Sequence, residues 1–409
     1  MIEEKENMIA VVGLGNIGLP LAIEFGKKYT TIGFDLDTQR INSLNQGINS
    51  RDTNSPAFKT PDKLTFSDKN QSIKDCNIYI IAVQTSVDSD GKPDINTLKS
   101  ASRMIGYLVK KDDLIIYEST TYPGCTEDVC VPILEQNSGL IFNQDFFVGY
   151  SPERINTADS VHTLRNTIKI TAGSDVATAQ RVDKLYKSII DAGTYPVSSI
   201  KIAEAAKLIE NAQRDINIAF MNNMANILST HHIPFDEVLN ASSSKWNFLK
   251  FSPGLVGGDC LPLASHYLNY FSNEKDNILS ISREINDNMP LTIAKLVGDK
   301  LRIIFPDEIN KRVLILGISY KPNTSSIKGS LIPNLINTLK ALNLDIDIYD
   351  PIAEQSYITQ IEQLIFEKQY HLIIKATNHQ IFENLDFSLI GVDNSIIFDI
   401  NQFSFKDNL

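Results

Sequence analysis

The stretch "MIAVVGLGNIGLPLAIEFGKKYTTIGFDLD", residues 8–37, decides the fold of the first part of the chain. It begins with a short apolar segment, typical of a parallel strand that is covered on both faces. Gly13, Gly15 and Gly18 follow in G-x-G-x-x-G spacing and open a helix-like segment. The first glycine permits the tight turn, the second lets the backbone approach a pyrophosphate, and the third lets helix and strand pack closely. The stretch therefore predicts a β-α-β unit that binds a dinucleotide.

The end of the second apolar segment, residues 30–35, indicates which dinucleotide is bound. Asp35 stands 22 residues after Gly13, where a carboxylate accepts hydrogen bonds from the ribose hydroxyls of NAD. The same charge repels the additional phosphate of NADP, and Asp37 adds to it. We therefore expect NAD as the cofactor, with its phosphates at the start of the following helix.

The composition narrows the class of protein. The 409 residues suggest two or three domains, and 38 basic against 49 acidic residues give a net charge of −11, which argues against a nucleic-acid surface. No apolar run approaches the ~20 residues of a membrane helix, and the start of the chain does not resemble a signal peptide. The four cysteines lack C-x-x-C spacing and the histidines are scattered, so we expect reduced thiols, a cytoplasmic protein and no metal site.

Further apolar segments predict two α/β units. We expect strands at 77–83, 113–120, 146–150 and 167–173, and again from 311 and at 344–351, 370–377 and 395–401. Thr120 ends one of these strands, and Thr85 and Glu153 follow the ends of two others, where parallel sheets bind ligands. The fold class predicted is α/β, with two Rossmann-like doubly wound domains (residues 1–195 and 301–409) joined by a central long helix within residues 196–300.

Residues 199–230 predict that long helix, with two faces. An apolar stripe recurs at helical spacing through Ile202, Ala205, Ile209, Ala212, Ile216, Ala219 and Phe220. Lys207, Asn211 and Arg214 form a row opposite it, which is either a solvated charged face or the lining of a cleft. The row lacks a carboxylate and is flanked by apolar residues, which favours a cleft that holds an anion or a hydroxyl-rich ligand. The two faces together suggest a homodimer through this helix.

The segment "VGGDCLPLASHYL", residues 256–268, places Cys260 after two glycines and before a helix-like run. One interpretation is a nucleophile presented to a ligand. The other is a small buried residue in a tight turn, as free cysteines commonly are. Lys321 and Lys328 raise a similar alternative, because they lie in a loop after a strand and are either phosphate ligands or ordinary surface lysines.

Six motifs resemble the UDP-glucose/GDP-mannose dehydrogenase family, and within it the bacterial UDP-N-acetylhexosamine 6-dehydrogenases of capsule and O-antigen synthesis. They are "VVGLGNIGLPLA", "YESTTYPGCTEDVCVPILE", "GYSPERIN", "AKLIENAQRDINIAF", "SKWNFLKFSPGLVGGDC" and "VLILGISYKPN". The resemblance covers nearly the whole chain. It implies oxidation of a sugar C6 alcohol to a carboxylate with two NAD per turnover, a homodimer, and a UDP-sugar-binding C-terminal domain.

The resemblance also implies roles for individual residues. Cys260 would attack the C6 aldehyde, Lys207 would stabilise oxyanion charge, Asn211 would orient the substrate, and Glu153 would act on the hydrolytic water with help from Thr120. Contacts to NAD are implied for Gly13, Gly15, Asn16, Ile17, Gly18, Asp35, Arg40, Thr85, Thr120 and Lys328. Contacts to the UDP-N-acetylhexosamine are implied for Arg154, Ile155, Lys207, Asn211, Arg214, Gly257, Tyr320 and Lys321.

Departures from the family pattern concentrate at the chemistry. The family usually reads G-G-H-C-x-x-V-D-P-Y-Y-L, so that Asp259 replaces a histidine, Ala264 an aspartate, and Ser265 and His266 a proline and a tyrosine. Other replacements are Asn16, "VQTS" at 83–86, Ser326, Lys328 and Asn401. Losing a general base costs 10²–10⁴-fold in rate, unless Asp259 or His266 takes over its work.

Three functions therefore compete at the level of sequence. The first is an NAD-dependent UDP-N-acetylhexosamine 6-dehydrogenase with reduced activity. The second is a catalytically impaired relative that binds nucleotide sugar or NAD without turnover. The third, a two-electron dehydrogenase of the 6-phosphogluconate or hydroxyacid type, is disfavoured by Cys260 and by the second α/β unit.

Overall fold

The computed structural model describes residues 6–50, 57–155, 162–258, 260–274, 276–353, 364, 367 and 369–407. The chain divides into two compact units. Unit 1 comprises Met1–Glu210 and His266–Asn273, and unit 2 comprises Asn211–Ser265 and Glu274–Leu409. Each unit is built on its own mainly parallel sheet, which confirms the predicted α/β class with two Rossmann-like units.

Unit 1 holds an eight-stranded sheet in the order β10-β9-β8-β7-β4-β1-β2-β3. Its strands are β1 (Met8–Val12), β2 (Thr30–Phe34), β3 (Leu64–Ser67), β4 (Ile78–Ile81), β7 (Leu114–Tyr117), β8 (Phe147–Tyr150), β9 (Lys169–Gly173) and β10 (Thr194–Pro196). All neighbours are parallel except β8 and β9, which run antiparallel. The chain leaves β1 toward β2 and later returns to β4 on the other side, which creates the switch point where such sheets bind ligands.

Helices cover both faces of this sheet because its central strands, such as β4 and β7, are apolar on both sides. Its helical segments are α1 (Gly18–Gly26), α2 (Thr38–Asn45), η1 (Asn70–Ile73), α3 (Asn96–Gly106), η2 (Thr126–Cys130), α4 (Val131–Ser138) and α5 (Val176–Lys187). Ile116 of β7 packs in one core with α1 and α5. The next residue, Tyr117, points to the opposite face, where its hydroxyl lies 2.8 Å from that of Ser102 on α3. A small hairpin, β5 (Ser86–Val87) and β6 (Pro93–Asp94), follows β4.

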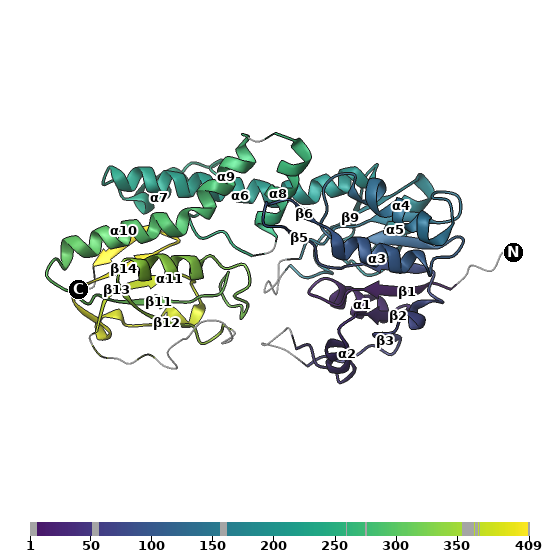
Figure 1. Ribbon diagram of the computed structural model, residues 1–409, viewed down its shortest axis with the longest axis horizontal. Helices are drawn as coiled ribbons and strands as arrows, with labels where there is room; N and C mark the ends of the chain where they lie inside the picture. The colour runs from purple at the N-terminus through teal and green to yellow at the C-terminus, as the bar shows by residue number, and fades with distance from the viewer. Residues whose placement is uncertain are drawn as a thin grey trace. The chain divides into compact units, whose positions relative to one another are not determined.

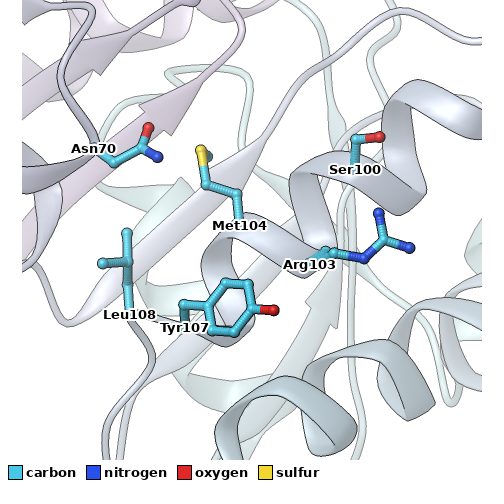
Figure 2. A pocket seen from close by; sticks show the side chains of 6 residues that line it. All are labelled: Asn70, Ser100, Arg103, Met104, Tyr107 and Leu108. Atoms are coloured by element: carbon cyan, nitrogen blue, oxygen red, sulfur yellow. The ribbon is translucent and has the colours of Figure 1, made fainter.

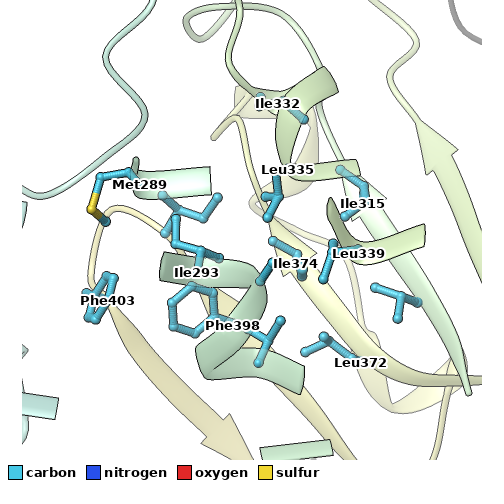
Figure 3. Close-up of a cluster of buried hydrophobic side chains, with 14 of the residues drawn as sticks. Met289, Ile293, Ile315, Ile332, Leu335, Leu339, Leu372, Ile374, Phe398 and Phe403 are labelled. Atoms are coloured by element: carbon cyan, nitrogen blue, oxygen red, sulfur yellow. The ribbon is translucent and has the colours of Figure 1, made fainter. Parts of the chain in front are cut away.

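Unit 2 holds a five-stranded sheet in the order β12-β11-β13-β14-β15. The strands are β11 (Arg312–Leu316), β12 (Asp345–Tyr349), β13 (Tyr370–Lys375), β14 (Gly391–Asp399) and β15 (Ser404–Asp407). Helices α10 (Met289–Ile304) and α11 (Ile332–Ala341) lie along one face of it (Figure 1). Val313 and Ile315 point into the core beneath these helices, whereas Leu314 and Leu316 point into a second cluster, as the two-residue period of a strand requires. Figure 3 shows the first of these cores, where Ile293 of α10 and Leu335 of α11 meet Phe398 of β14.

The remaining helical segments are α6 (Ile200–Thr230), α7 (Phe235–Ser243), α8 (Leu261–Ser272), α9 (Ile278–Asp287), η3 (Gln380–Phe382) and η4 (Phe387–Leu389). The predicted long helix at 199–230 is thus confirmed as α6. The predicted strands are present too, most of them shortened by a residue or more, whereas β14 begins four residues before the predicted 395–401 and ends two residues earlier. Strands β3, β10 and β15 were not expected, because each is three or four residues long and carries little periodicity.

Helix α6 exposes only part of its predicted apolar stripe, because Ala212 and Ala219 are buried. Ile202, Ile209 and Phe220 are 47%, 58% and 55% exposed in the single chain. The opposite side is buried and carries polar residues at helical spacing, among them Lys207 and Asn211. In the part of the chain that the structure describes, no helix combines the length and hydropathy needed to cross a bilayer.

Candidate active site

The glycine loop after β1 has the geometry that a pyrophosphate needs. Gly13 adopts a φ of +91°, and a Cβ there would lie 2.9 Å from the Ala82 carbonyl oxygen at the end of β4. A Cβ on Gly18 would lie 1.8 Å from the Gly13 carbonyl oxygen. Neither position accepts a side chain, so the backbone and the start of α1 are held close together and open to a phosphate.

Asp35 and Arg40 brace this loop from β2 and α2. One oxygen of Asp35 accepts the N–H of Leu14 at 2.8 Å, and the other accepts the N–H of Asp37 at 3.0 Å. The Arg40 guanidinium is buried and donates to the Leu14 carbonyl oxygen at 3.1 and 3.2 Å. Arg40 therefore supports the loop that would hold the cofactor, while Asp35 keeps oxygen lone pairs for a ribose.

The other residues expected at the cofactor lie around the same strand ends. Thr85, after β4, donates its hydroxyl to the carbonyl oxygen of Thr120, after β7, at 2.8 Å. Asn16 is exposed in the glycine loop, and the neighbouring Ile17 packs against the core of unit 1. The structure thus brings these four residues to the carboxyl ends of the central strands, where the sequence predicted Thr85 and Thr120 and the resemblance implied Asn16 and Ile17.

Glu204 of α6 fixes the segment that carries Thr120, and sequence reasoning missed it. Its carboxylate is fully buried and accepts the backbone N–H groups of Gly124 and Thr126 at 2.6 and 3.0 Å. The hydroxyls of Thr121 and Thr126 donate to it as well, at 3.1 and 2.6 Å. Burial raises the pKa of Glu204, and these hydrogen bonds oppose that rise.

Glu153 and Lys207, both expected in the chemistry, meet in unit 1. The ammonium of Lys207 donates to the backbone carbonyl oxygen of Glu153, and both side chains are more than nine-tenths buried. One carboxylate oxygen of Glu153, Oε1, accepts the N–H groups of Arg154 and Ile155 at 2.6 and 2.5 Å. The turn after β8 therefore fixes the orientation of the carboxylate and leaves its other oxygen, Oε2, outside these two hydrogen bonds.

The guanidinium of Arg154, an expected substrate contact, is bound within unit 1. It forms an ion pair with Glu210 at 2.7 Å and donates to the carbonyl oxygen of Ile168 at 2.9 Å. A substrate phosphate would have to share this guanidinium with Glu210.

Cys260 is exposed at the start of α8, whereas Cys76, Cys125 and Cys130 are buried. The structure therefore rejects the interpretation of Cys260 as a buried core residue. The amide of Asn211 donates to the Cys260 carbonyl oxygen at 3.4 Å, which fixes the residue to α6 within unit 2. Burial raises the pKa of Cys76 to about 12, so that thiol stays protonated and inert.

The two glycines before Cys260 pack directly on the loop that follows β11. A Cβ on Gly257 would lie 2.2 Å from the Gly329 carbonyl oxygen, and the Gly258 N–H donates to that oxygen at 2.9 Å. Gly258 has a φ of +84°, and a Cβ there would lie 3.0 Å from the ring of Tyr320. Lys321 places its ammonium 5.6 Å from the centre of the same ring. Four residues that were expected to bind substrate or to act in catalysis are thus neighbours in unit 2: Gly257, Cys260, Tyr320 and Lys321.

A buried cluster behind this loop was not expected from the sequence. The imidazole of His379 accepts the backbone N–H of Asn323 at 2.8 Å and lies 3.1 Å from Asp350 and 3.0 Å from the hydroxyl of Ser319. Burial alone would raise the pKa of Asp350, but hydrogen bonds from His379 and the Ile318 N–H outweigh it and lower the pKa to about 2. The cluster fixes both ends of the turn that carries Tyr320 and Lys321.

The residues that depart from the family pattern differ in their burial and in their contacts. Ala264 is fully buried, one turn after Cys260, and Ser265 donates to the buried carboxylate of Asp215 at 2.6 Å. In unit 1, the ring of His266 packs against Gly91 of the β5–β6 hairpin. Asp259 lies outside the described residues, so its expected role remains a prediction.

Two expected contact residues, Arg214 and Lys328, are exposed. The prediction that Lys207, Asn211 and Arg214 share one buried face is therefore partly wrong, because the buried side of α6 continues from Asn211 to Asp215 and not to Arg214. This buried side also contains carboxylates, Glu204 and Asp215, which the sequence argument had excluded from it. Hydrogen-bonding partners on other elements allow these acids to be buried.

A pocket of about 310 Å³ lies elsewhere in unit 1, beside α3 (Figure 2). Its lining residues are Asn70, Ser100, Arg103, Met104, Tyr107 and Leu108. Tyr107 and Leu108 follow α3 and lead toward the start of β7, so this part of the pocket is near the amino ends of the strands. It is therefore not part of the loop cluster that would bind the dinucleotide.

Comparison with known proteins relates most of the chain to one family. Three models of the UDP-glucose/GDP-mannose dehydrogenase family match in order: the NAD binding domain over residues 7–190, the central domain over 201–288 and the UDP binding domain over 314–405. UDP-N-acetyl-D-glucosamine 6-dehydrogenase of Salmonella typhi is 40% identical, over 97% of this chain and 96% of its own length. The enzyme of the same name from Pseudomonas aeruginosa is also 40% identical, over 98% of both chains.

Solved structures show the same fold. UDP-D-ManNAc dehydrogenase from Pyrococcus horikoshii superposes with a TM-score of 0.88 at 28% identity, over 97% of this chain and 96% of the other. UDP-N-acetyl-mannosamine dehydrogenase Cap5O from Staphylococcus aureus has a TM-score of 0.84 at 27% identity, over 98% and 97% of the two chains.

The chain therefore belongs to the UDP-glucose/GDP-mannose dehydrogenase family and is an NAD-dependent nucleotide-sugar dehydrogenase. Its cofactor is NAD. The residues fit that cofactor, because neither Gly13 nor Gly18 has room for a Cβ and Asp35, after β2, would accept hydrogen bonds from the ribose hydroxyls.

Asp35→Asn should weaken NAD binding and reduce the preference for NAD over NADP. The asparagine oxygen still accepts the Leu14 N–H, so the loop is retained while the charge that repels the 2′-phosphate is lost. Asp35→Ala removes both the charge and the acceptor for the Leu14 N–H, so it should weaken the binding of NAD and of NADP further. Calorimetric dissociation constants for NAD and NADP on the three proteins check this. Equal affinity of the unmutated protein for the two cofactors would show that Asp35 does not select NAD.

Proposed function

We propose that the chain oxidises the C6 alcohol of a UDP-N-acetylhexosamine to the carboxylate, with Cys260 as covalent nucleophile. Residues 1–195 would bind NAD, 196–300 would form a dimer, and 301–409 would bind the UDP group. Support comes from the 40% identity to two UDP-N-acetyl-D-glucosamine 6-dehydrogenases over nearly the full chain. The product would be a cytoplasmic precursor of acidic polysaccharides such as capsule or O-antigen.

The first oxidation converts the alcohol to an aldehyde: a hydride would pass from C6 to the nicotinamide, and the hydroxyl proton would pass to solvent water. Each NAD accepts one hydride when it is bound. Because oxidation of the alcohol to the carboxylate releases two hydrides, the complete reaction consumes two NAD. Lys207 would stabilise the negative charge that develops on the C6 oxygen, and Asn211, one turn further along α6, would orient the sugar. The bond from Lys207 to the Glu153 carbonyl oxygen holds its ammonium in place.

The second oxidation needs a covalent step. The thiolate of Cys260 would add to the aldehyde carbon and form a thiohemiacetal, which loses the second hydride and becomes a thioester. Glu153 would take a proton from water as the water attacks the thioester, which releases the carboxylate and regenerates the thiol. Holding the aldehyde on sulfur splits one difficult step into easier ones and keeps the aldehyde from leaving.

The observation that carries this proposal is the exposure of Cys260, beside Asn211 and on glycines that pack against the Tyr320 loop. The other cysteines of the chain are buried. Ala264 is the observation that favours the alternative, a relative that binds its ligands without turnover, because no carboxylate stands at that position.

Cys260→Ser should abolish acid formation while UDP-sugar binding persists, since a serine hydroxyl is a far weaker nucleophile than a thiolate. We expect the rate of acid production to fall by roughly a hundredfold or more. Acid production by chromatography and UDP-sugar affinity by calorimetry check this on both proteins. As a control, iodoacetamide should label the folded unmutated protein at Cys260 alone, because the other thiols are buried. Full acid production by the serine variant would reduce the thiol to a structural role.

Ala264→Asp should raise the rate of NADH formation by about one to two decades if this position limits the rate, which is the order of a missing general base. Ala264→Asn is the matched control, because it adds the same bulk without a proton acceptor. Steady-state rates on UDP-N-acetylglucosamine and UDP-N-acetylgalactosamine decide the outcome. Fast turnover without any gain in the aspartate variant would assign the proton to Asp259 or His266. Binding of UDP sugar without turnover by either protein would favour the alternative function.

We also propose a homodimer through α6. Ile202, Ile209, Phe220 and Ile227 lie within one narrow helical stripe and are each 41% or more exposed in the single chain. A contiguous apolar stripe of this kind is typical of a surface that another protein chain covers.

Ile209→Glu should convert the dimer to a monomer, because it puts a charge in the middle of the stripe. Light scattering coupled to size-exclusion chromatography measures the mass directly. Leu342→Glu, at an apolar residue that is 40% exposed after α11, is the control and should remain dimeric. A monomeric unmutated protein, or a variant that remains a dimer, would contradict the proposed interface.

A further inference from the structure

Beneath Glu153 lies a buried charge pair that the proposed mechanism does not use. Glu118, directly after β7, is fully buried, and Lys169, the first residue of β9, is 2% exposed. The Lys169 ammonium donates to Glu118 at 2.6 Å and to the carbonyl oxygen of Pro152 at 3.0 Å. The hydroxyl of Tyr186 on α5 donates to the second oxygen of Glu118. Every group of this pair therefore has a partner.

The free oxygen of Glu153 faces the same ammonium. Glu153 Oε2 is buried and makes no hydrogen bond within the described parts of the chain, and it lies 3.6 Å from Lys169 Nζ. That distance is too long for a hydrogen bond and short enough for a strong attraction between charges. An unsatisfied buried carboxylate oxygen is costly, so it indicates a ligand such as the water or substrate of the reaction.

Two carboxylates thus share one ammonium. Burial raises the pKa of Glu118 and the nearby charge of Glu153 adds to the rise, whereas the charge of Lys169 and the hydrogen bonds from Lys169 and Tyr186 lower it and favour the ionised form. Burial and the charge of Glu118 raise the pKa of Tyr186 well above its usual range, so it stays a neutral donor. Two other described cations lie at this turn. The ammonium of Lys207 donates to the Glu153 carbonyl oxygen, and the guanidinium of Arg154 pairs with Glu210.

We infer that Lys169 and Glu118 are positioning residues that set the proton affinity of Glu153. The ammonium of Lys169 favours the ionised form of Glu153, and Glu118 weakens that effect because it takes up part of the same charge. The inference deepens the proposed function, because it rests on Glu153 as the base of thioester hydrolysis.

Opposite shifts distinguish this role from a merely structural one. Lys169→Met removes the cation that faces Glu153, so we expect the proton affinity of Glu153 to rise, by about one pH unit or more. Glu118→Gln retains an acceptor for Lys169 and Tyr186 but leaves the whole ammonium charge to Glu153, so its proton affinity should fall. A structural role would give shifts of the same sign, or none.

The experiment titrates Glu153 directly. The protein, labelled with ¹³C at glutamate carboxyls, is followed by NMR from pH 4 to 9, and the Glu153 signal is assigned by its loss in Glu153→Gln. The acidic limb of the pH–rate profile for acid formation is measured on the same variants. We expect the midpoint and the limb to move to higher pH in Lys169→Met and to lower pH in Glu118→Gln.

Two controls keep the outcome decisive. Lys187→Met removes an exposed ion pair with Asp183 on α5 and should shift nothing. The double variant Lys169→Met/Glu118→Gln removes both charges and should return the midpoint toward the unmutated value, which a folding defect would not do. Shifts of one sign, or no shift, would overturn the inference. NMR shifts of the expected signs in a protein without any turnover would support the inferred role of Lys169 and Glu118. They would overturn the proposed function instead.

Discussion

The buried polar side of α6 is the constraint on which the functional parts of both units depend. A helix that buries charged and amide side chains must satisfy every one of them, because an unpaired polar group away from water costs about 1–3 kcal/mol and a charge costs more. In α6, each such group is satisfied by a loop or helix that carries functional residues. Packing alone would tolerate small slides of these loops, whereas hydrogen bonds to a rigid helix fix them.

The pairings follow the helix in order. In unit 1, Glu204 holds the segment after Thr120, and Lys207 holds the turn of Glu153. In unit 2, Asn211 holds the carbonyl of Cys260, and Asp215 accepts bonds from Ser265 on α8 and from Arg283 and Asn286 on α9. Asn222 then exchanges two hydrogen bonds with Gly254, at 2.8 and 3.0 Å. Within each unit, the residues proposed for catalysis are therefore positioned by hydrogen bonds to that unit's part of α6.

The sequence predicts well where a rule of local geometry applies. The glycine spacing and Asp35 predict the dinucleotide loop, because the turn and the close packing each require a missing Cβ. The 3.6-residue period predicts α6 to within one residue at its start. Cys260 could not be settled from the sequence, since exposure depends on what the Gly257–Gly258 turn packs against, and that partner, Gly329, lies 71 residues later.

The residues that were missed share one property, which is that their partners are distant in sequence. Glu118 directly follows β7 and Lys169 begins β9, next to segments that resemble ordinary apolar strands, and His379 and Asp350 belong to separate loops of unit 2. A lone charged residue at a strand end usually faces solvent, so nothing local marks it as buried. The spacing of Glu204, Lys207, Asn211 and Asp215 did offer a sign, because three and four residues apart is one helix face.

The stoichiometry of the reaction tests the central claim most directly. Covalent capture of the aldehyde by Cys260 requires that each UDP-N-acetylhexosamine is carried through both oxidations before release. NADH is measured by absorbance, and the uronic acid and any free aldehyde by mass spectrometry, in one time course with limiting sugar. The account predicts two NADH for each acid formed and no free aldehyde at any time. One NADH for each sugar, with accumulation of the aldehyde, would contradict it.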